Sequence, residues 1–214
     1  MKVVGVLCAL SALVLTQINC SPELNAAVDQ SLIALKNDPL FRDTYFLRHV
    51  TTRFTVNEDS VAVQGTLNFT NTIMNGFKNG IVRAGDVQTP FDDRSNSALL
   101  VLLAGPMRFS SNVKKSFAGE DSTYLVYGNT SDVRMEIELT ATPSSLIAIK
   151  HYYRGFNEVN VREIHQANNK TKIIIKESAQ EGLSNLVGNQ SNPMWTALFN
   201  NIATWEAVRN ILLQ

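Results

Sequence analysis

Three histidines, His49, His151 and His165, are the side chains of this sequence best suited to acid–base chemistry near neutral pH. His151 precedes two tyrosines and His165 lies two positions after Glu163, so each has a neighbour that could share a proton. The sequence contains no serine-nucleophile elbow, zinc-protease motif, phosphate-binding loop or dinucleotide-binding glycine pattern. We therefore expect no enzymatic activity, and an ester hydrolase that uses His151 or His165 is the alternative.

The sequence also lacks residues at the spacing that is typical of metal ligands. No two of the histidines lie three or four positions apart, the spacing that places ligands on one face of a helix. Asp92 and Asp93 follow Pro90 in a turn-like segment, but they lack the ligand spacing of a calcium-binding loop. We expect neither a metal nor a cofactor.

The N-terminus has the pattern of a secretory signal. Lys2 is followed by an apolar run over Val3–Leu15 and then by a polar exit. The run is shorter than the roughly 20 residues that span a bilayer, which makes a membrane anchor the weaker alternative. We predict a signal peptide at 1–20, with cleavage near Cys20, and an extracellular, secreted protein.

Both cysteines, Cys8 and Cys20, fall within this leader, so the mature chain over 21–214 is expected to lack disulfides. Secreted chains use cystines chiefly when their core is too small to hold them together. A chain of this length buries roughly 70% of its unfolded surface. We predict a single domain stabilised by its hydrophobic core.

The predicted mature chain over 21–214 has four N-x-S/T sequons, which are candidate glycosylation sites in a secreted chain. They begin at Asn68, Asn129, Asn169 and Asn189. We expect at least one of them to carry a glycan. Asn68 lies on the polar face of a predicted strand, where a glycan is tolerated.

Two amphipathic helices are predicted at the ends of the mature chain. Ser21-Pro22 is a capping pair, and apolar residues follow it at helical spacing up to Leu35, with Pro39 beyond the end. The last helix begins near Asn192-Pro193. Its apolar stripe is wide and holds both tryptophans, so most of its length is expected to be buried.

Between the helices the period changes to two, which predicts strands. Alternation is clearest over Val61–Thr70 and Val133–Ala141, with turn-rich segments and no helices between strands. Shorter predicted strands are Val50–Val56, Ile81–Val87, Leu99–Leu103, Thr123–Tyr127, Leu146–Tyr153, Val159–Ile164 and Thr171–Lys176. The order favours an antiparallel sheet in an α+β fold, with Gly65 and Gly105 as bulges or bends that help to curve it.

Charge is balanced, with 19 Lys and Arg residues against 19 Asp and Glu residues. Nucleic acids and anionic membrane surfaces are therefore poor candidates for the main partner. Apolar surface is therefore the feature of the chain that remains available for binding a ligand. A fourteen-carbon chain gains on the order of 10 kcal/mol from burial before ordering costs are subtracted, at about 0.8 kcal/mol per methylene.

A curved sheet around a wide apolar helix can leave a ligand site between two apolar surfaces, although ordinary core packing explains any single residue equally well. The residues predicted to line such a site lie on two strands and on the last helix. They are Val63, Leu67, Phe69, Ile137, Leu139, Trp195, Leu198, Phe199 and Ile202.

Three short segments resemble the group 7 mite allergens and their insect relatives. They are Val61-Ala-Val-Gln-Gly65-Thr-Leu67, Gly76-Phe77-Lys78, and Val82-Arg83-Ala84-Gly85-Asp86-Val87. The resemblance implies a fold like half of the bactericidal/permeability-increasing protein, in the superfamily of takeout and juvenile hormone-binding proteins. In that fold a strongly curved antiparallel sheet wraps around a long C-terminal helix, and many members carry lipids or lipopeptides. The mature chain lacks the N-terminal disulfide usual in the takeout branch, which argues against hormone transport.

Composition and resemblance together predict a non-enzymatic carrier or sensor of a hydrophobic or amphipathic ligand, without stable membrane insertion. We expect a monomer. The alternative is an innate-immune surface protein that recognises bacterial lipid or lipopeptide. Balanced charge weakens this alternative, because docking on anionic bacterial surfaces usually uses a basic patch.

Overall fold

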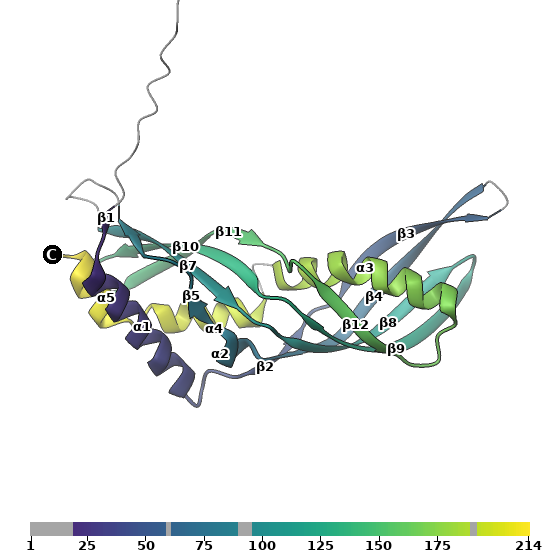
Figure 1. Cartoon of the computed structure of the whole chain (residues 1–214), viewed down its shortest axis with the longest axis horizontal. Helices are drawn as coiled ribbons and strands as arrows, with labels where there is room; N and C mark the ends of the chain where they lie inside the picture. The colour runs from purple at the N-terminus through teal and green to yellow at the C-terminus, as the bar shows by residue number, and fades with distance from the viewer. Residues whose placement is uncertain (1–18, 59–60, 90–95, 189–191) are drawn as a thin grey trace, which may run out of the picture.

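The computed structural model describes residues 19–58, 61–89, 96–188 and 192–214 as an elongated molecule of helices and antiparallel strands (Figure 1). Most of the predicted leader therefore lies outside the described residues. Its last two positions form the short strand β1 (Asn19–Cys20), which pairs with β6 (Gln88–Thr89).

Sheet A occupies one end of the molecule and has six strands in the described residues. Its strand order is β1-β6-β7-β10-β11, and β5 also pairs with β7. The remaining bounds are β5 (Val82–Arg83), β7 (Ser97–Ala104), β10 (Val133–Ala141) and β11 (Leu146–Arg154).

Sheet B occupies the other end, also with six described strands, in the order β12-β9-β8-β4-β2. The strand β3 pairs with β4 beyond the end of β2, because β4 is long enough to have both as neighbours. The bounds are β2 (Thr44–Leu47), β3 (Val50–Glu58), β4 (Val61–Asn75), β8 (Arg108–Phe117), β9 (Glu120–Thr130) and β12 (Val159–Ile164).

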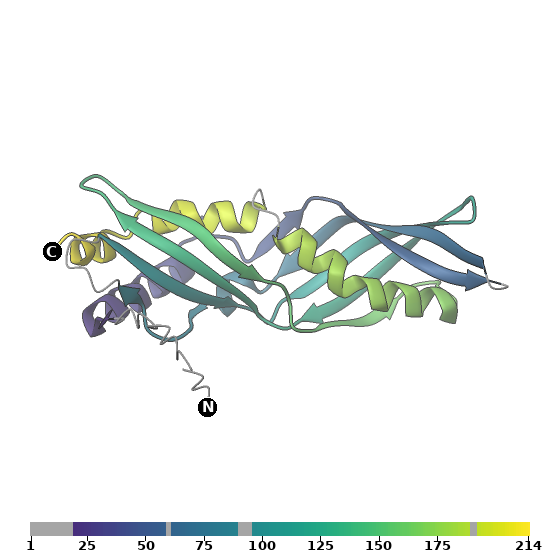
Figure 2. The ribbon, with the colours of Figure 1, turned by 90° about the horizontal axis from the view of Figure 1, so that it is seen from above.

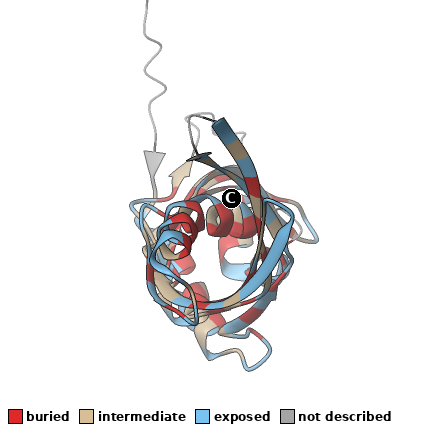
Figure 3. Ribbon diagram, turned by 90° about the vertical axis from the view of Figure 1, so that its right-hand side faces the viewer, coloured by how far each residue is buried: buried red, intermediate tan, exposed pale blue. Residues whose placement is uncertain are grey.

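Different helices cover the two sheets, as the view from above shows (Figure 2). The helices α1 (Pro22–Asn37), α4 (Pro193–Ile202) and α5 (Glu206–Leu212) lie at the end of sheet A. The helix α3 (Asn169–Gly188) packs on β3, β4 and β12 of sheet B, and the short α2 (Phe77–Gly80) packs on β7. Viewed along the long axis, the strands form a curved outline and buried residues of the helices lie inside it (Figure 3).

The N-terminal helix and the antiparallel strands confirm the α+β prediction. The Ser21 hydroxyl accepts a hydrogen bond from the backbone N–H of Leu24 at 3.2 Å, which satisfies one of the free donors at the start of α1. The strand β10 alternates as predicted, with Val133, Ile137 and Leu139 fully buried on its inner face. Gly105 lies at a bend between β7 and β8, where a Cβ would come within 2.9 Å of Asp132.

Four predictions about elements need correction. The segment Thr171–Lys176 is not a strand but the start of α3, because Asn168 caps it: its side chain accepts a hydrogen bond from the N–H of Thr171 at 2.8 Å. There are two sheets rather than one. The last helical region is interrupted between α4 and α5, at 203–205. Gly65 lies in a regular part of β4, with no register shift at its position.

The junction between α3 and α4 joins the two ends of the molecule. Asn192, which is 3% exposed, accepts a hydrogen bond from Met194 N–H at 2.9 Å and donates to the carbonyl of Leu186 at 3.3 Å. The indole N–H of Trp195 donates to the carbonyl of Val187 at 2.5 Å. One asparagine and one tryptophan therefore start α4 and satisfy carbonyls at the end of α3.

Replacing Asn192 with alanine removes the cap of α4 and leaves buried backbone groups without partners. We expect a loss of about 1–3 kcal/mol in the free energy of unfolding, measured by urea denaturation. Asn200→Ala is the matched control, because Asn200 is exposed on the same helix. Equal stabilities of the two variants would contradict this role of Asn192.

Candidate ligand-binding site

The structure divides the predicted ligand-lining residues between the two sheets. Val63, Leu67 and Phe69 lie on the inner face of β4 in sheet B, which α3 covers. Ile137 and Leu139 lie on β10 in sheet A, which α5 covers, while α4 packs between β11 and β2. The nine residues therefore do not surround one common space.

The interior of sheet A is tightly packed around these residues. Ile137, Leu139, Trp195, Leu198 and Ile202 are each 0% exposed, and Phe199 is partly buried against the same core. Side chains of the protein itself occupy the space that the sequence pattern assigned to a ligand. Packing of this kind stabilises the fold.

The middle of sheet B is filled in the same way, by Phe69. A Cβ added to Gly182 of α3 would lie 2.7 Å from the Phe69 ring, so the helix can approach only because residue 182 has no side chain. Phe69 is 0% exposed and Leu67 beside it is also fully buried. Any ligand of sheet B must therefore bind beyond Phe69, toward the start of α3.

Beyond Phe69 the inner face of sheet B stays apolar but becomes half-buried. We call this end of sheet B, where β3 and β4 project past α3, the distal mouth (Figure 1). Its inward-facing, half-buried side chains are Phe54, Val56, Val63, Phe117 and Tyr124. The rings of Phe54 and Phe117 stack with centroids 5.7 Å apart, and Phe54 covers Gly65, where a Cβ would clash with it.

Two lysines lie beside Phe117 at this mouth. The Lys115 ammonium is 5.3 Å from the centroid of the Phe117 ring, and it donates a hydrogen bond to the Thr171 hydroxyl at 3.3 Å. The Lys170 ammonium is 6.0 Å from the same centroid. The mouth therefore combines apolar side chains with positive charge, which suits an apolar chain with an anionic end.

A buried hydroxyl without a partner lies on the same inner face. Thr52 of β3 is 2% exposed, and its Oγ1 makes no hydrogen bond within the described part of the chain. Thr52 is paired with Leu67, between Phe54 and the start of β3. A polar atom left unpaired in an apolar interior costs free energy, which would be recovered if a ligand or a water molecule bound to it.

The segment Gly76-Phe77-Lys78 lies near the junction of the sheets and acts structurally. Gly76 has a φ of 101° and its N–H donates to the Asp43 carboxylate at 3.1 Å, which turns the chain into α2. Phe77 is fully buried, with its ring centroid 5.2 Å from that of Trp195. Lys78 donates to the Asp38 carbonyl at 2.6 Å, just past the end of α1.

Burial in the same aromatic cluster raises the pKa of Tyr45 to about 12. The Tyr45 ring lies edge-on to Phe77, with centroids 5.7 Å apart. Its hydroxyl has no hydrogen-bond partner in the described residues. Tyr45 therefore stays neutral at physiological pH and contributes packing rather than proton transfer.

The segment Arg83-Ala-Gly85-Asp86 fastens α1 to sheet A. Arg83 Nε and Nη2 donate to the two oxygens of Asp29 in α1, at 2.9 and 2.8 Å. These hydrogen bonds hold the pKa of the Asp29 carboxyl below its usual value. Asn25 of α1 donates to Asp86 at 2.9 Å and accepts from the Val87 N–H at 2.8 Å. Two of the three segments that carry the family resemblance, at Gly76 and at Arg83, thus position helices, whereas the third lies in β4 and includes Val63 of the mouth.

The structure describes the side chains of two of the three histidines, His49 and His165. His165 Nε2 lies 3.2 Å from Glu163 Oε1, and its ring is edge-on to Tyr127 on the exposed side of sheet B. His49 is exposed in the short connection between β2 and β3. The side chain of His151 and both Asp92 and Asp93 lie outside the described residues. Among those described, no three His, Cys, Asp or Glu side chains are placed to hold a metal ion.

Three of the four sequons fall in the described residues, all of them in sheet B or α3. Asn68 and Asn129 are half-buried within β4 and β9, and Asn169 is exposed at the first residue of α3. Asn189 lies outside the described residues. Of the three, Asn169 is the most accessible for a glycan, and glycosylation of each stays a prediction.

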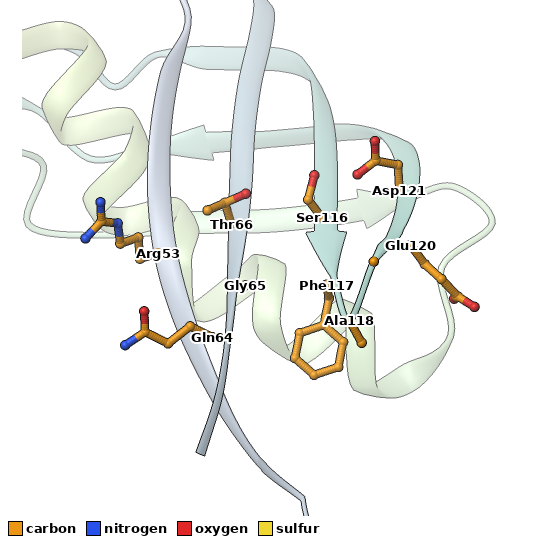
Figure 4. A pocket seen from close by; sticks show the side chains of 10 residues that line it. Arg53, Gln64, Gly65, Thr66, Ser116, Phe117, Ala118, Glu120 and Asp121 are labelled. Carbon is orange, nitrogen blue, oxygen red and sulfur yellow. The ribbon is translucent and has the colours of Figure 1, made fainter. Parts of the chain in front are cut away.

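The outer side of sheet B carries an open hollow of about 300 Å³, whose lining has both polar and apolar surface (Figure 4). It is lined by residues of β3, β4, β8 and β9, including Arg53, Thr66, Ser116 and Asp121. These side chains lie on the opposite side of the sheet from the distal mouth, as the alternation of each strand requires.

Most residues of the distal mouth were not predicted from the sequence. Val63 was predicted, but Lys115 and Phe117 lie in β8, whose inner face mixes apolar and polar side chains and therefore lacks a clear alternation. Lys170 and Thr171 begin α3, whose three successive isoleucines favoured a strand. The signal that predicts the helix is the apolar spacing from Ile174 onward to Val187.

Comparisons with known proteins give likenesses to solved structures alone. No protein-family model and no curated protein sequence matches this chain. A crystal structure of lipopolysaccharide binding protein is similar, with 12% sequence identity and a TM-score of 0.47. The match covers 89% of this chain and 40% of that chain, so this chain spans less than half the length of that protein. Membership of the group 7 mite allergen family stays a prediction.

In the described part of the chain, none of the helices combines the length and the hydropathy needed to cross a bilayer.

Truncating Phe69 tests whether the middle of sheet B is filled. Phe69→Ala should lower the free energy of unfolding by about 3–5 kcal/mol, because it leaves a cavity against Gly182. Ile149→Ala is the control, since Ile149 is 56% exposed on sheet A and should shift stability by about 0.5 kcal/mol or less. Urea denaturation monitored by tryptophan fluorescence measures both, and a Phe69→Ala cost as small as the control would show that the interior is open.

Proposed function

We propose that this chain is a secreted, non-enzymatic binding protein that holds a hydrophobic or amphipathic ligand at the distal mouth of sheet B. The observation that supports it best is the change in burial along one continuous apolar face. Leu67 and Phe69 are fully buried, whereas Phe54, Val56 and Val63 on the same inner face are only half-buried. Apolar surface left partly open next to a packed core favours a ligand.

The charges at the mouth support an amphipathic ligand with an acidic end. An apolar tail would lie along Val56, Val63 and the Phe54–Phe117 pair, and its carboxylate or phosphate would meet Lys115 and Lys170. Because the mouth is partly exposed, each ion pair contributes modestly, and the tail supplies most of the affinity. The protein would act as a monomeric carrier or sensor, with strands curved around its helices as in the resembling fold.

An innate-immune protein that recognises bacterial lipid is the second candidate, and the two lysines are the observation that favours it. A phosphorylated bacterial lipid and a fatty acid share an apolar tail and an anionic end. The two candidates therefore differ in the preferred ligand, not in the site.

The first experiment identifies what the mouth binds. The secreted protein is extracted into organic solvent for mass spectrometry, and the delipidated protein is titrated with a dansylated fatty acid and with lipid A. We expect saturable binding of at least one of the two. Tighter binding of lipid A would favour the innate-immune candidate, and tighter binding of the fatty acid the carrier.

Charge placed in the mouth should abolish this binding. Val63→Asp puts a carboxylate among apolar side chains and beside the ligand tail, so we expect affinity to fall at least tenfold, about 1.4 kcal/mol. Ile149→Asp on sheet A is the control and should bind normally. Circular dichroism establishes that both variants are folded. No co-purifying lipid together with no saturable binding, or equal binding by both variants, would refute the proposal.

A further inference from the structure

One row of polar side chains, contributed by four strands, crosses the hollow on the outer side of sheet B. Arg53 of β3 pairs with Thr66 of β4, Thr66 pairs with Ser116 of β8, and Ser116 pairs with Asp121 of β9. Figure 4 shows these four side chains following one another across the sheet. Three strand spacings of about 4.8 Å give the row a length of roughly 14 Å.

The row presents hydrogen-bonding groups in a fixed order. Arg53 donates only, Thr66 and Ser116 both donate and accept, and the Asp121 carboxylate accepts only. Arg53 forms no ion pair or hydrogen bond within the described residues, so its guanidinium is available to a ligand. Gly119, where an added Cβ would meet no atom within 4 Å, leaves room beside the row.

The acceptor end of the row is held in place. Lys114 Nζ lies 2.7 Å from Asp121 Oδ2, and hydrogen bonds from Lys114 and Ser116 keep the pKa of the Asp121 carboxyl below its usual value. The carboxylate is therefore ionised at neutral pH. It still has lone pairs for further donors, because a carboxylate accepts about four hydrogen bonds.

The charge of the hollow decides the class of ligand. Arg53 and Lys114 are balanced by Glu120 and Asp121, so neither an anion nor a cation is favoured as a whole. Phe117 and Ala118 are the apolar side chains among the lining residues, so the apolar surface of the hollow is interspersed with polar groups and forms no continuous path for a lipid tail. A neutral ligand with many hydroxyl groups matches what remains.

We propose that the row Arg53, Thr66, Ser116 and Asp121 binds a neutral saccharide on the outer side of sheet B. Sugar hydroxyls donate to Asp121 and accept from Arg53. The Thr66 hydroxyl can donate and accept, and the Ser116 hydroxyl, which already donates to Asp121, accepts. The row lies on the opposite side of the strands from the distal mouth, and the hollow and the mouth share Phe117. The sequon at Asn68 lies two positions along β4 from Thr66, so the protein's own glycan would be a neighbour of the bound sugar.

The test uses the full secreted protein after enzymatic removal of N-glycans. Isothermal titration calorimetry with chitohexaose, laminarihexaose and maltohexaose should reveal binding of at least one. Arg53→Ala and Asp121→Asn should each weaken that binding about tenfold or more, because each removes hydrogen bonds to a charged group. Glu138→Gln, an exposed position on β10 of sheet A, is the matched control and should bind normally.

Circular dichroism establishes that all three variants remain folded, and the fatty-acid titration shows that the mouth is intact. Failure of all three hexasaccharides to bind at millimolar concentration would overturn the saccharide site. Binding that persists in both Arg53→Ala and Asp121→Asn would overturn it as well. Neither result affects the lipid site, which the Val63→Asp titration tests separately.

Discussion

Each of the two sheets is open, so its apolar inner face is stable in water only when a helix covers it. This constraint organises the molecule. The helix α3 covers sheet B, while α1, α4 and α5 cover sheet A. The two sets are linked where Asn192 and Trp195 bind the carbonyls at the end of α3. Loss of these polar contacts would uncouple the helices whose packing buries both faces.

The distance between each helix and the sheet that it covers then determines where a ligand can bind. At Gly182 the missing side chain lets α3 approach β4, and the Phe69 ring fills the space between them. In sheet A the tryptophan-bearing helix packs so fully that its inner residues are completely buried. The apolar inner face of sheet B extends beyond the helix that covers it at the start of α3. The distal mouth is therefore a consequence of helix length relative to strand length.

Two of the three segments that carry the family resemblance, at Lys78 and at Arg83–Asp86, serve the same constraint. Arg83 and Asp86 bind α1 through Asp29 and Asn25, and Lys78 binds a carbonyl at the end of that helix. Such contacts specify how a helix docks on a sheet. They identify a way of packing and contain no information about the ligand, which is why resemblance in these segments predicts a fold more directly than a function.

The sequence predicted the elements whose pattern is local. Alternation over β4 and β10 and the capping residues of α1 and α4 are visible in single segments. The start of α3 was misinterpreted because three isoleucines favour a strand, whereas the cap at Asn168 and the spacing over the next four turns favour a helix.

The sequence could not predict that the ligand-lining residues would be divided between two sheets, because this division depends on which helix covers which strand. The same holds for the difference between Val63 and Leu67. They are neighbours on one face of β4, and only the end of α3 makes one half-exposed and the other buried.

Methyl NMR with a spin-labelled fatty acid tests the central claim most directly, because it locates the bound chain. The account predicts that the label broadens the methyl signals of Val56 and Val63 at the distal mouth. Signals of Ile137 and Leu139, inside sheet A, should keep their intensity. Broadening of Ile137 and Leu139 with unchanged Val56 and Val63 would place the ligand in the other sheet and contradict the account.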